Sequence, residues 1–151
     1  VVAIKKGGLR IDQETALDHV FGYAIGCDLT RRDLQSEAKK LSRPWATAKG
    51  FDFSAPIGPL VTKEDIPSLL EPNTPIVLKV NEEIRQNSTI DKMVWTIPEM
   101  ISILSTYFRL KPGDLIFTGT PAGVAAIEKD DQISIYCGEL PPCEFTIGKE
   151  E

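Results

Sequence analysis

Short apolar stretches, separated by turns rich in proline and glycine, dominate the pattern of the chain. Most of these stretches have the length and composition of β-strands. They cover residues 1–4, 23–29, 76–80, 84–88, 115–118, 133–136 and 144–147. The stretches at 76–80 and 84–88 are close enough in sequence to pair as a hairpin around Asn81 and Glu82.

Three segments are predicted as helices, two of them from apolar side chains at helical spacing and the middle one from its cap at Thr30 and the stop at Pro44. They cover residues 13–20, 31–41 and 96–108. The last is the clearest helix, because Thr96 and Glu99 form a capping box and Pro98 occupies the first turn. Asp12 and Thr30 are placed to cap the two earlier helices.

The order of these elements determines the expected fold class. Strands do not alternate regularly with helices, which disfavours a doubly wound parallel sheet. The segment 50–59 is rich in proline and glycine and predicts an irregular loop. We therefore expect a single strand-rich α+β domain over residues 1–151.

Composition and charge narrow the class of protein. The chain has 151 residues, with 42% hydrophobic and 26% charged side chains and a net charge of -5. An acidic chain argues against nucleic acid as a partner, because phosphate binding requires a basic surface. No apolar run approaches the roughly 20 residues of a membrane span, so we expect no membrane partner.

The cysteines, Cys27, Cys137 and Cys143, do not have the spacing of a metal finger. Cys137 and Cys143 flank a short loop and could form a disulfide, but we expect reduced thiols. Reduced thiols indicate a reducing compartment, the cytoplasm, or the mitochondrion if the source is eukaryotic.

Candidate chemistry lies around the predicted helix at 31–41. Asp28 stands where a strand meets this helix, and Arg32 and Gln35 share one helix face. Lys49 returns on the following loop. A carboxylate, a guanidinium, an amide and an amine can therefore converge on an anionic, oxygen-rich ligand held through a metal. By residue type alone, the same side chains also fit a solvated surface.

Two further features have both a structural and a functional interpretation. His19 could act as a general base, but on a short helix ahead of Asp28 we interpret it as structural. The loop 119–123 lacks the motifs of a P-loop or a dinucleotide site. Its backbone N–H groups and the Thr120 hydroxyl can bind a carboxylate, or the hydroxyl can close the turn on itself.

Ordered motifs in this sequence resemble the fumarylacetoacetate hydrolase family, and within it the acylpyruvate hydrolase branch. The motifs are G-C-D-L-T-R-R-D-L-Q at 26–35, P-W-A-T-A-K-G-F at 44–51, V-N-E-E-I-R-Q at 80–86, M-V-W at 93–95 and K-P-G-D-L-I-F-T-G-T-P-A-G-V at 111–124. The resemblance covers nearly the whole chain and weakens after about residue 125. It implies a roll of mixed β-sheets of the family's C-terminal domain type, and a homodimer.

The resemblance also implies a reaction. The substrate is a 2,4-dioxo acid such as fumarylpyruvate or acetylpyruvate, which chelates Mg²⁺ or Mn²⁺. Asp28 is then a metal ligand, and Lys49 stabilises the metal-held pyruvate enolate that leaves when the C–C bond is hydrolysed. Lys49 and Gln35 are the expected catalytic residues. Arg32 and Gln35 orient the substrate or the water, and Thr120 binds the substrate carboxylate.

Members of this family also use a Glu-x-Glu motif for the metal and a His–Glu pair as base, and neither is in this sequence. Because the chain opens inside the apolar stretch 1–4, we expect it to be N-terminally incomplete, a weak metal binder and a poor catalyst by itself. The alternatives are oxaloacetate decarboxylation or dienedioate isomerisation in the same superfamily. A non-catalytic scaffold or dimerisation module is the third class.

Overall fold

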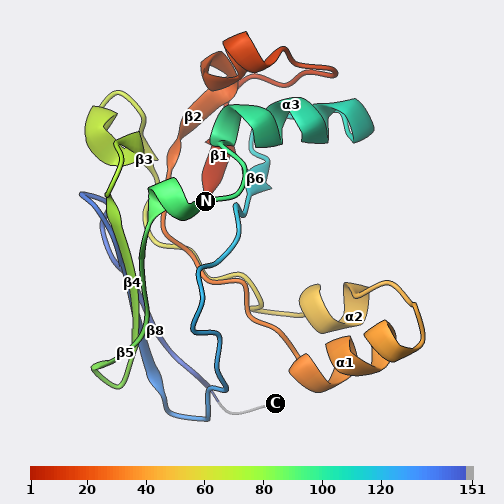
Figure 1. Cartoon of the computed structure of the whole chain (residues 1–151), viewed down its shortest axis with the longest axis vertical. Coiled ribbons are helices and arrows are strands. Elements are labelled where there is room, and N and C mark those ends of the chain that lie inside the picture. Colours follow the sequence, from red (N-terminus) through yellow and green to blue (C-terminus); the bar gives the residue numbers. More distant parts are fainter. Residues whose placement is uncertain (149–151) are drawn as a thin grey trace.

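Two four-stranded sheets form the framework of the computed structural model, which describes residues 1–148 (Figure 1). The first has the order β3-β2-β1-β6, with β3 at Val61–Thr62, β2 at Val20–Tyr23, β1 at Val2–Ile4 and β6 at Leu115–Ile116. The second has the order β5-β4-β7-β8, with β5 at Glu83–Thr89, β4 at Pro75–Val80, β7 at Gln132–Cys137 and β8 at Cys143–Thr146. The strand-rich α+β class is confirmed. The sheets are antiparallel rather than mixed, because each strand pair recorded within residues 1–148 runs in opposite directions.

Helices, with η denoting the 3₁₀ type, flank these sheets. They are η1 (Gln13–His19), α1 (Arg32–Lys40), α2 (Ala46–Lys49), η2 (Pro67–Leu70), η3 (Ile90–Lys92) and α3 (Ile97–Tyr107). The predicted capping box of α3 is confirmed, since Thr96 Oγ1 accepts from the Glu99 N–H and the Glu99 carboxylate accepts from the Thr96 N–H. None of the helices described here is both long enough and apolar enough to cross a bilayer.

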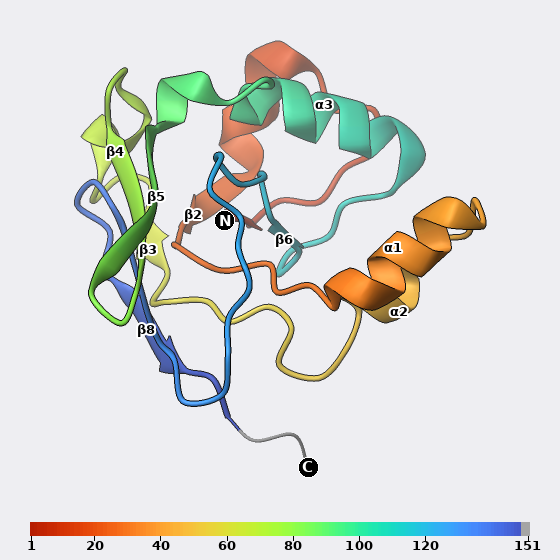
Figure 2. The same ribbon diagram turned by 60° about the horizontal axis from the view of Figure 1, so that its bottom comes forward.

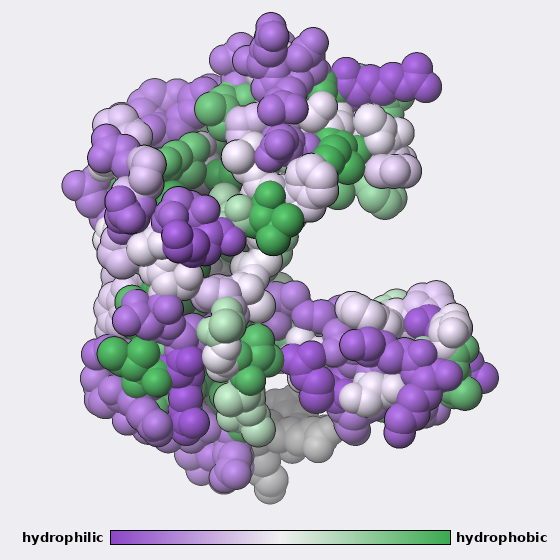
Figure 3. All heavy atoms as spheres, viewed as in Figure 1, coloured by the Kyte–Doolittle hydropathy of each residue, from purple (hydrophilic) through white to green (hydrophobic). Residues whose placement is uncertain are grey.

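Helices α1 and α2 pack against each other and project away from the sheets (Figure 1). Figure 3 shows the molecule hollowed between this pair and the part that contains α3. The structure corrects two predictions here. Thr30 does not cap α1, whose N-cap is Arg31 without a side-chain hydrogen bond, and Lys49 ends the helical turn α2 rather than lying on a loop.

The predicted hairpin at 76–88 is confirmed, with β4 and β5 paired so that Leu78 faces Gln86. Asn81 and Glu82 form its turn with φ values of 50° and 67°. Positive φ at both central residues matches a type I′ turn, whose twist suits a two-residue hairpin. Asn81 is supported by its side chain, which donates to Asp131 and accepts from the Gln132 N–H.

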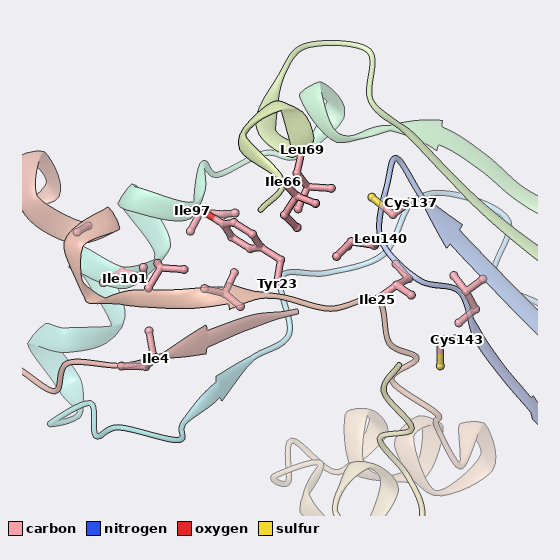
Figure 4. Packing of buried hydrophobic residues seen from close by; sticks show 14 of the residues in the cluster. Ile4, Tyr23, Ile25, Ile66, Leu69, Ile97, Ile101, Cys137, Leu140 and Cys143 are labelled. Carbon is pink, nitrogen blue, oxygen red and sulfur yellow. The ribbon is translucent and has the colours of Figure 1, made fainter. Parts of the chain in front are cut away.

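One apolar core joins the two sheets (Figure 4). Ile101 of α3 is fully buried, and Ile4 of β1 is nearly so. Figure 4 shows the core continuing from these residues to Cys137, Leu140 and Cys143 at the second sheet. Burying a side chain the size of isoleucine contributes about 1.5–3 kcal/mol, so this core fixes the sheets relative to each other and with them the loops at their ends.

Candidate active site

A cavity of about 740 Å³ opens between the second sheet and the segments that follow β2 and β6. In Figure 2 the segment after β6 runs alongside the β4–β5 hairpin. The apolar lining includes Ile76, Leu78, Val80, Ile133 and Ile135 from β4 and β7. The polar lining includes Asp28, Thr30, Arg32, Lys49 and Thr120. Four of the site residues expected from the sequence, Asp28, Arg32, Lys49 and Thr120, thus border the same cavity.

Asp28 and Lys49 are in direct contact. Lys49 Nζ donates to Asp28 Oδ2 at 2.6 Å and to Thr30 Oγ1 at 2.8 Å. The side chains of Lys49 and Asp28 are 32% and 54% exposed, and ion pairs with such exposure contribute at most about 1 kcal/mol to folding. The pair is therefore better explained as a way of orienting both groups than as a source of stability.

The backbone around Asp28 explains why this contact forms. The segment after β2 is extended, and it is hydrogen-bonded to the chain that follows α1. Cys27 N–H donates to Pro56, Leu29 N–H to Ser54 and Arg31 N–H to Ala48. These bonds hold the Asp28 segment beside α2, whose last residue is Lys49.

Arg32 and Gln35 form a pair on α1. Arg32 Nη1 donates to Gln35 Oε1 at 2.6 Å. Gln35 is only 7% exposed, and it is absent from the described residues that line the cavity, whereas Arg32 is among them. The structure therefore places Gln35 against Arg32 and away from the cavity wall, so that it can act on a ligand through the guanidinium.

Thr120 lies on the turn after β6, between Gly119 and Pro121. Gly119 has a φ of +106°, a conformation that favours glycine. The Thr120 hydroxyl is held by Gln86 of β5, whose Nε2 donates to Thr120 Oγ1 at 2.9 Å and to the Pro121 carbonyl at 2.8 Å. The turn is thus fastened to the second sheet beside the cavity.

The charge at the cavity is predominantly positive. Arg32 and Lys49 face it, whereas Asp28 is the single carboxylate that lines it within residues 1–148. Arg85 also borders the cavity and pairs with Glu83 at 3.2 Å. An excess of cations in a concave site favours a ligand that carries carboxylates.

Neither Cys27 nor His19 offers reactive chemistry at this cavity. Burial, together with the charges of Cys143 and Asp28, raises the pKa of the Cys27 thiol to about 11, so the nucleophilic thiolate is scarce at neutral pH. His19 is 8% exposed, and its Nδ1 lies 2.7 Å from the Lys6 carbonyl oxygen. This agrees with the structural interpretation of His19.

Among the described residues that line the cavity, Asp28 is the one that can supply a carboxylate ligand to a metal ion. In the part of the chain that the structure describes, no group of three His, Cys, Asp or Glu side chains could hold a metal ion. Asp28 offers a partly exposed carboxylate at the cavity, and carboxylate oxygens are the ligands that hard divalent ions prefer.

Two polar residues of the site were not assigned to it from the sequence. Thr30 was interpreted as a helix cap, and its position two residues after Asp28 is the only local signal for its contact with Lys49. Gln86 belongs to a motif that carried the family resemblance, but nothing local indicates that it reaches Thr120, 34 residues later.

The two-sheet architecture agrees with a family-level match. Residues 1–148 match the family model described as fumarylacetoacetate (FAA) hydrolase, C-terminal. The chain therefore belongs to the fumarylacetoacetate hydrolase family.

Individual relatives extend this finding. The chain is 39% identical to a fumarylpyruvate hydrolase from Ralstonia sp over 151 residues, which is 100% of this chain and 77% of the relative. It is 40% identical to the mitochondrial oxaloacetate tautomerase FAHD1 of Mus musculus, covering 99% of this chain and 67% of the relative.

A solved structure of fumarylpyruvate hydrolase from Pseudomonas aeruginosa, in complex with Mn²⁺ and pyruvate, superposes with a TM-score of 0.92. It is 44% identical, and the match covers 99% of this chain and 63% of that one. The chain thus spans roughly two thirds of the length of these relatives, which act on more than one kind of keto acid.

Proposed function

We propose that the protein is a divalent-metal-dependent hydrolase that cleaves the C–C bond of acylpyruvates such as fumarylpyruvate or acetylpyruvate. The Ralstonia relative and the Pseudomonas structure with Mn²⁺ and pyruvate support this reaction class. The observation that carries the proposal is the 2.6 Å contact between Lys49 Nζ and Asp28 Oδ2, at a cavity that Arg32 and Thr120 also line.

An acylpyruvate is complementary to both walls of this cavity. Its carboxylate suits the Arg32 guanidinium and the Thr120 hydroxyl, because charge-assisted hydrogen bonds to carboxylates are the stronger ones. Its acyl chain suits the apolar wall of β4 and β7. In this proposal Gln35 orients Arg32 through their 2.6 Å hydrogen bond.

In the proposed hydrolysis, the oxygen of water adds to the acyl carbonyl carbon, and the bond from that carbon to C3 of the pyruvate unit breaks. The electron pair passes to the pyruvate unit as an enolate, which takes up a proton at C3 to give pyruvate. The acyl carbon keeps the water oxygen and leaves as a carboxylate, and the second proton of the water is released. The Lys49 ammonium is placed to stabilise the negative oxygen of this enolate. That charge develops during the reaction, so the interaction raises kcat more than it lowers KM.

Asp28 is the proposed protein ligand of the divalent ion, Mg²⁺ or Mn²⁺. Its Oδ2 is engaged by Lys49, which leaves Oδ1 for the cation. When bound, such an ion supplies Lewis-acid polarisation of the keto-acid oxygens. Oxygens of the keto acid and of water would supply further ligands of the kind that such an ion prefers.

A pyruvate-release assay tests the proposal directly. The purified full-length protein is mixed with fumarylpyruvate or acetylpyruvate in Mg²⁺, in Mn²⁺ and in EDTA. We expect pyruvate release with either metal and none in EDTA. Absence of release from both substrates with both metals would overturn the proposed hydrolase activity.

A second candidate function is tautomerisation or decarboxylation of oxaloacetate. It is favoured by the FAHD1 relative. Tautomerisation and decarboxylation of oxaloacetate each pass through an enolate, and Lys49 could stabilise it as well as the enolate of the proposed hydrolysis. Faster turnover of enol-oxaloacetate or oxaloacetate than of any acylpyruvate would favour this candidate.

We also propose a homodimer in a reducing compartment. Tyr107 and Phe108 are adjacent at the end of α3 and are 76% and 64% exposed, and they support apolar surface that a second copy covers. The cysteines in the described residues are free thiols, which supports the cytoplasm. Light scattering on the purified protein tests the dimer, and a monomer mass at micromolar concentration would contradict it.

A further inference from the structure

Gln86 is a buried amide in an otherwise exposed stretch of β5. It is 8% exposed, while its neighbours Arg85 and Asn87 are exposed. Burying an amide is unfavourable unless its hydrogen-bonding groups find partners. The partners of Gln86 lie on the turn that carries Thr120, so its burial serves that turn.

The direction of these hydrogen bonds follows from the chemistry of the partners. The Pro121 oxygen is a carbonyl oxygen and can only accept, so Gln86 must present its NH₂ group there. The same nitrogen lies 2.9 Å from Thr120 Oγ1, and its second hydrogen points to that oxygen. Thr120 Oγ1 is therefore an acceptor toward Gln86.

A hydroxyl that accepts one hydrogen bond still has its own hydrogen to donate. Within residues 1–148 no protein group is recorded as accepting the Thr120 hydroxyl hydrogen, and Thr120 is exposed at the cavity. An accepted hydrogen bond also polarises the hydroxyl and strengthens the bond that it donates.

Gly123 keeps this turn against β5. Its φ is +105°, and a Cβ at this position would collide with the Arg85 carbonyl oxygen. The backbone of the turn therefore lies directly on the strand residue before Gln86. The contact holds Thr120 within reach of the amide.

We propose that Gln86 is a positioning residue that fixes Thr120 as the hydrogen-bond donor to the carboxylate of the keto acid. This inference rests on the proposed function, since it requires that a keto acid bind at the cavity. Gln86 also borders the cavity, but both hydrogens of its NH₂ group are engaged by Thr120 and Pro121, so its proposed action on the keto acid is through the Thr120 hydroxyl.

A double-mutant cycle on ligand affinity tests the inference. Pyruvate is titrated calorimetrically into the Mn²⁺-loaded protein, for the wild type, Gln86→Met, Thr120→Val and the double variant. Methionine keeps the length of glutamine without its hydrogen bonds, and valine keeps the shape of threonine without its hydroxyl. Asn87→Leu, on the exposed side of the same strand, is the matched control, and Tm is recorded for each protein.

We expect Gln86→Met and Thr120→Val each to weaken pyruvate binding about 10-fold, the usual effect of a lost hydrogen bond to a charged group. The double variant is expected to bind no more weakly than Thr120→Val alone, because Gln86 has nothing left to orient. Asn87→Leu should bind pyruvate like the wild type.

The opposing outcomes separate the two proposals. If Thr120→Val weakens binding but Gln86→Met does not, or if the two effects multiply, the role of Gln86 is wrong while the proposed function stands. If Gln86→Met lowers Tm but leaves the pyruvate Kd unchanged, Gln86 is only structural. If the wild type itself does not bind pyruvate in Mn²⁺, the proposed function and the inference both fail.

Discussion

Lys49 Nζ lies 2.6 Å from Asp28 Oδ2, although the two residues are 21 positions apart in the sequence. The contact joins the extended segment after β2 to the end of α2, and it borders a cavity lined on the other side by apolar strands. A cation and an anion held together at the edge of an apolar pocket can interact with the charged carboxylate end of a keto acid. The acyl chain can then pack against the apolar strands.

Asp28→Asn should remove metal-dependent activity. The amide keeps the shape of the side chain but loses the negative charge that a hard cation requires. We expect kcat/KM to fall by about 100-fold or more, and the rise in Tm that Mn²⁺ produces in the wild type to disappear. Asp52→Asn changes an exposed carboxylate outside the cavity and should behave like the wild type. An unchanged Mn²⁺ response in Asp28→Asn would refute the assignment of this ligand.

Lys49→Met should lower turnover more than binding. The ammonium is proposed to stabilise charge that appears only as the C–C bond breaks, so its loss should lower kcat about 100-fold with a smaller change in KM. Lys40→Met, at the exposed end of α1, is the control for removing a lysine charge. A variant with normal kcat and a raised KM would instead assign Lys49 to substrate binding alone.

Thr30→Val tests a contact that was not anticipated from the sequence. Thr30 Oγ1 accepts from Lys49 Nζ at 2.8 Å, and valine removes this acceptor while keeping the shape of the side chain. We expect kcat to fall by about 10-fold, as for one lost hydrogen bond to a charged group, with Tm nearly unchanged. A strongly lowered Tm with a normal kcat would contradict this expectation, because Thr30 would then act in folding and not in catalysis.

These contacts show which features of the structure could be predicted from the sequence and which could not. The capping box at Thr96 and the hairpin at Asn81 depend on neighbours in the chain, so their local patterns predicted them correctly. The contacts of Lys49 with Thr30 and of Gln86 with Thr120 depend on how distant segments pack, and no local pattern encodes that packing.

The strand boundary after residue 20 was misplaced for a related reason. The pattern predicts a helix to residue 20 and a strand from residue 23, but β2 spans Val20–Tyr23. Gly22 lies within this strand, where a Cβ would collide with the Val61 carbonyl oxygen. Glycine is required there by the close approach of β3, a distant partner. The apolar residues after Tyr23, predicted as a strand, instead form an extended segment with an isolated bridge from Gly26 to Ile57.

The raised pKa of Cys27 predicts an alkaline loss of stability. The folded thiol keeps its proton up to a pKa of about 11, against 9.0 for an ordinary thiol. Between these values the unfolded chain loses its proton first, so the free energy of unfolding falls as pH rises. We expect Cys27→Ala to reduce this slope in urea titrations across that range. Rapid alkylation of Cys27 by iodoacetamide in the folded protein at neutral pH would contradict the raised pKa.

Exchange of the pyruvate methyl protons with D₂O, followed by NMR in the presence of Mg²⁺, tests the central claim most directly. It reports enolate formation from a keto acid whether the natural reaction is hydrolysis, tautomerisation or decarboxylation. The expected result is exchange catalysed by the wild type, abolished by EDTA and strongly slowed in both Asp28→Asn and Lys49→Met. Exchange at the wild-type rate in both variants, or no exchange by the wild-type protein, would contradict the role of this pair.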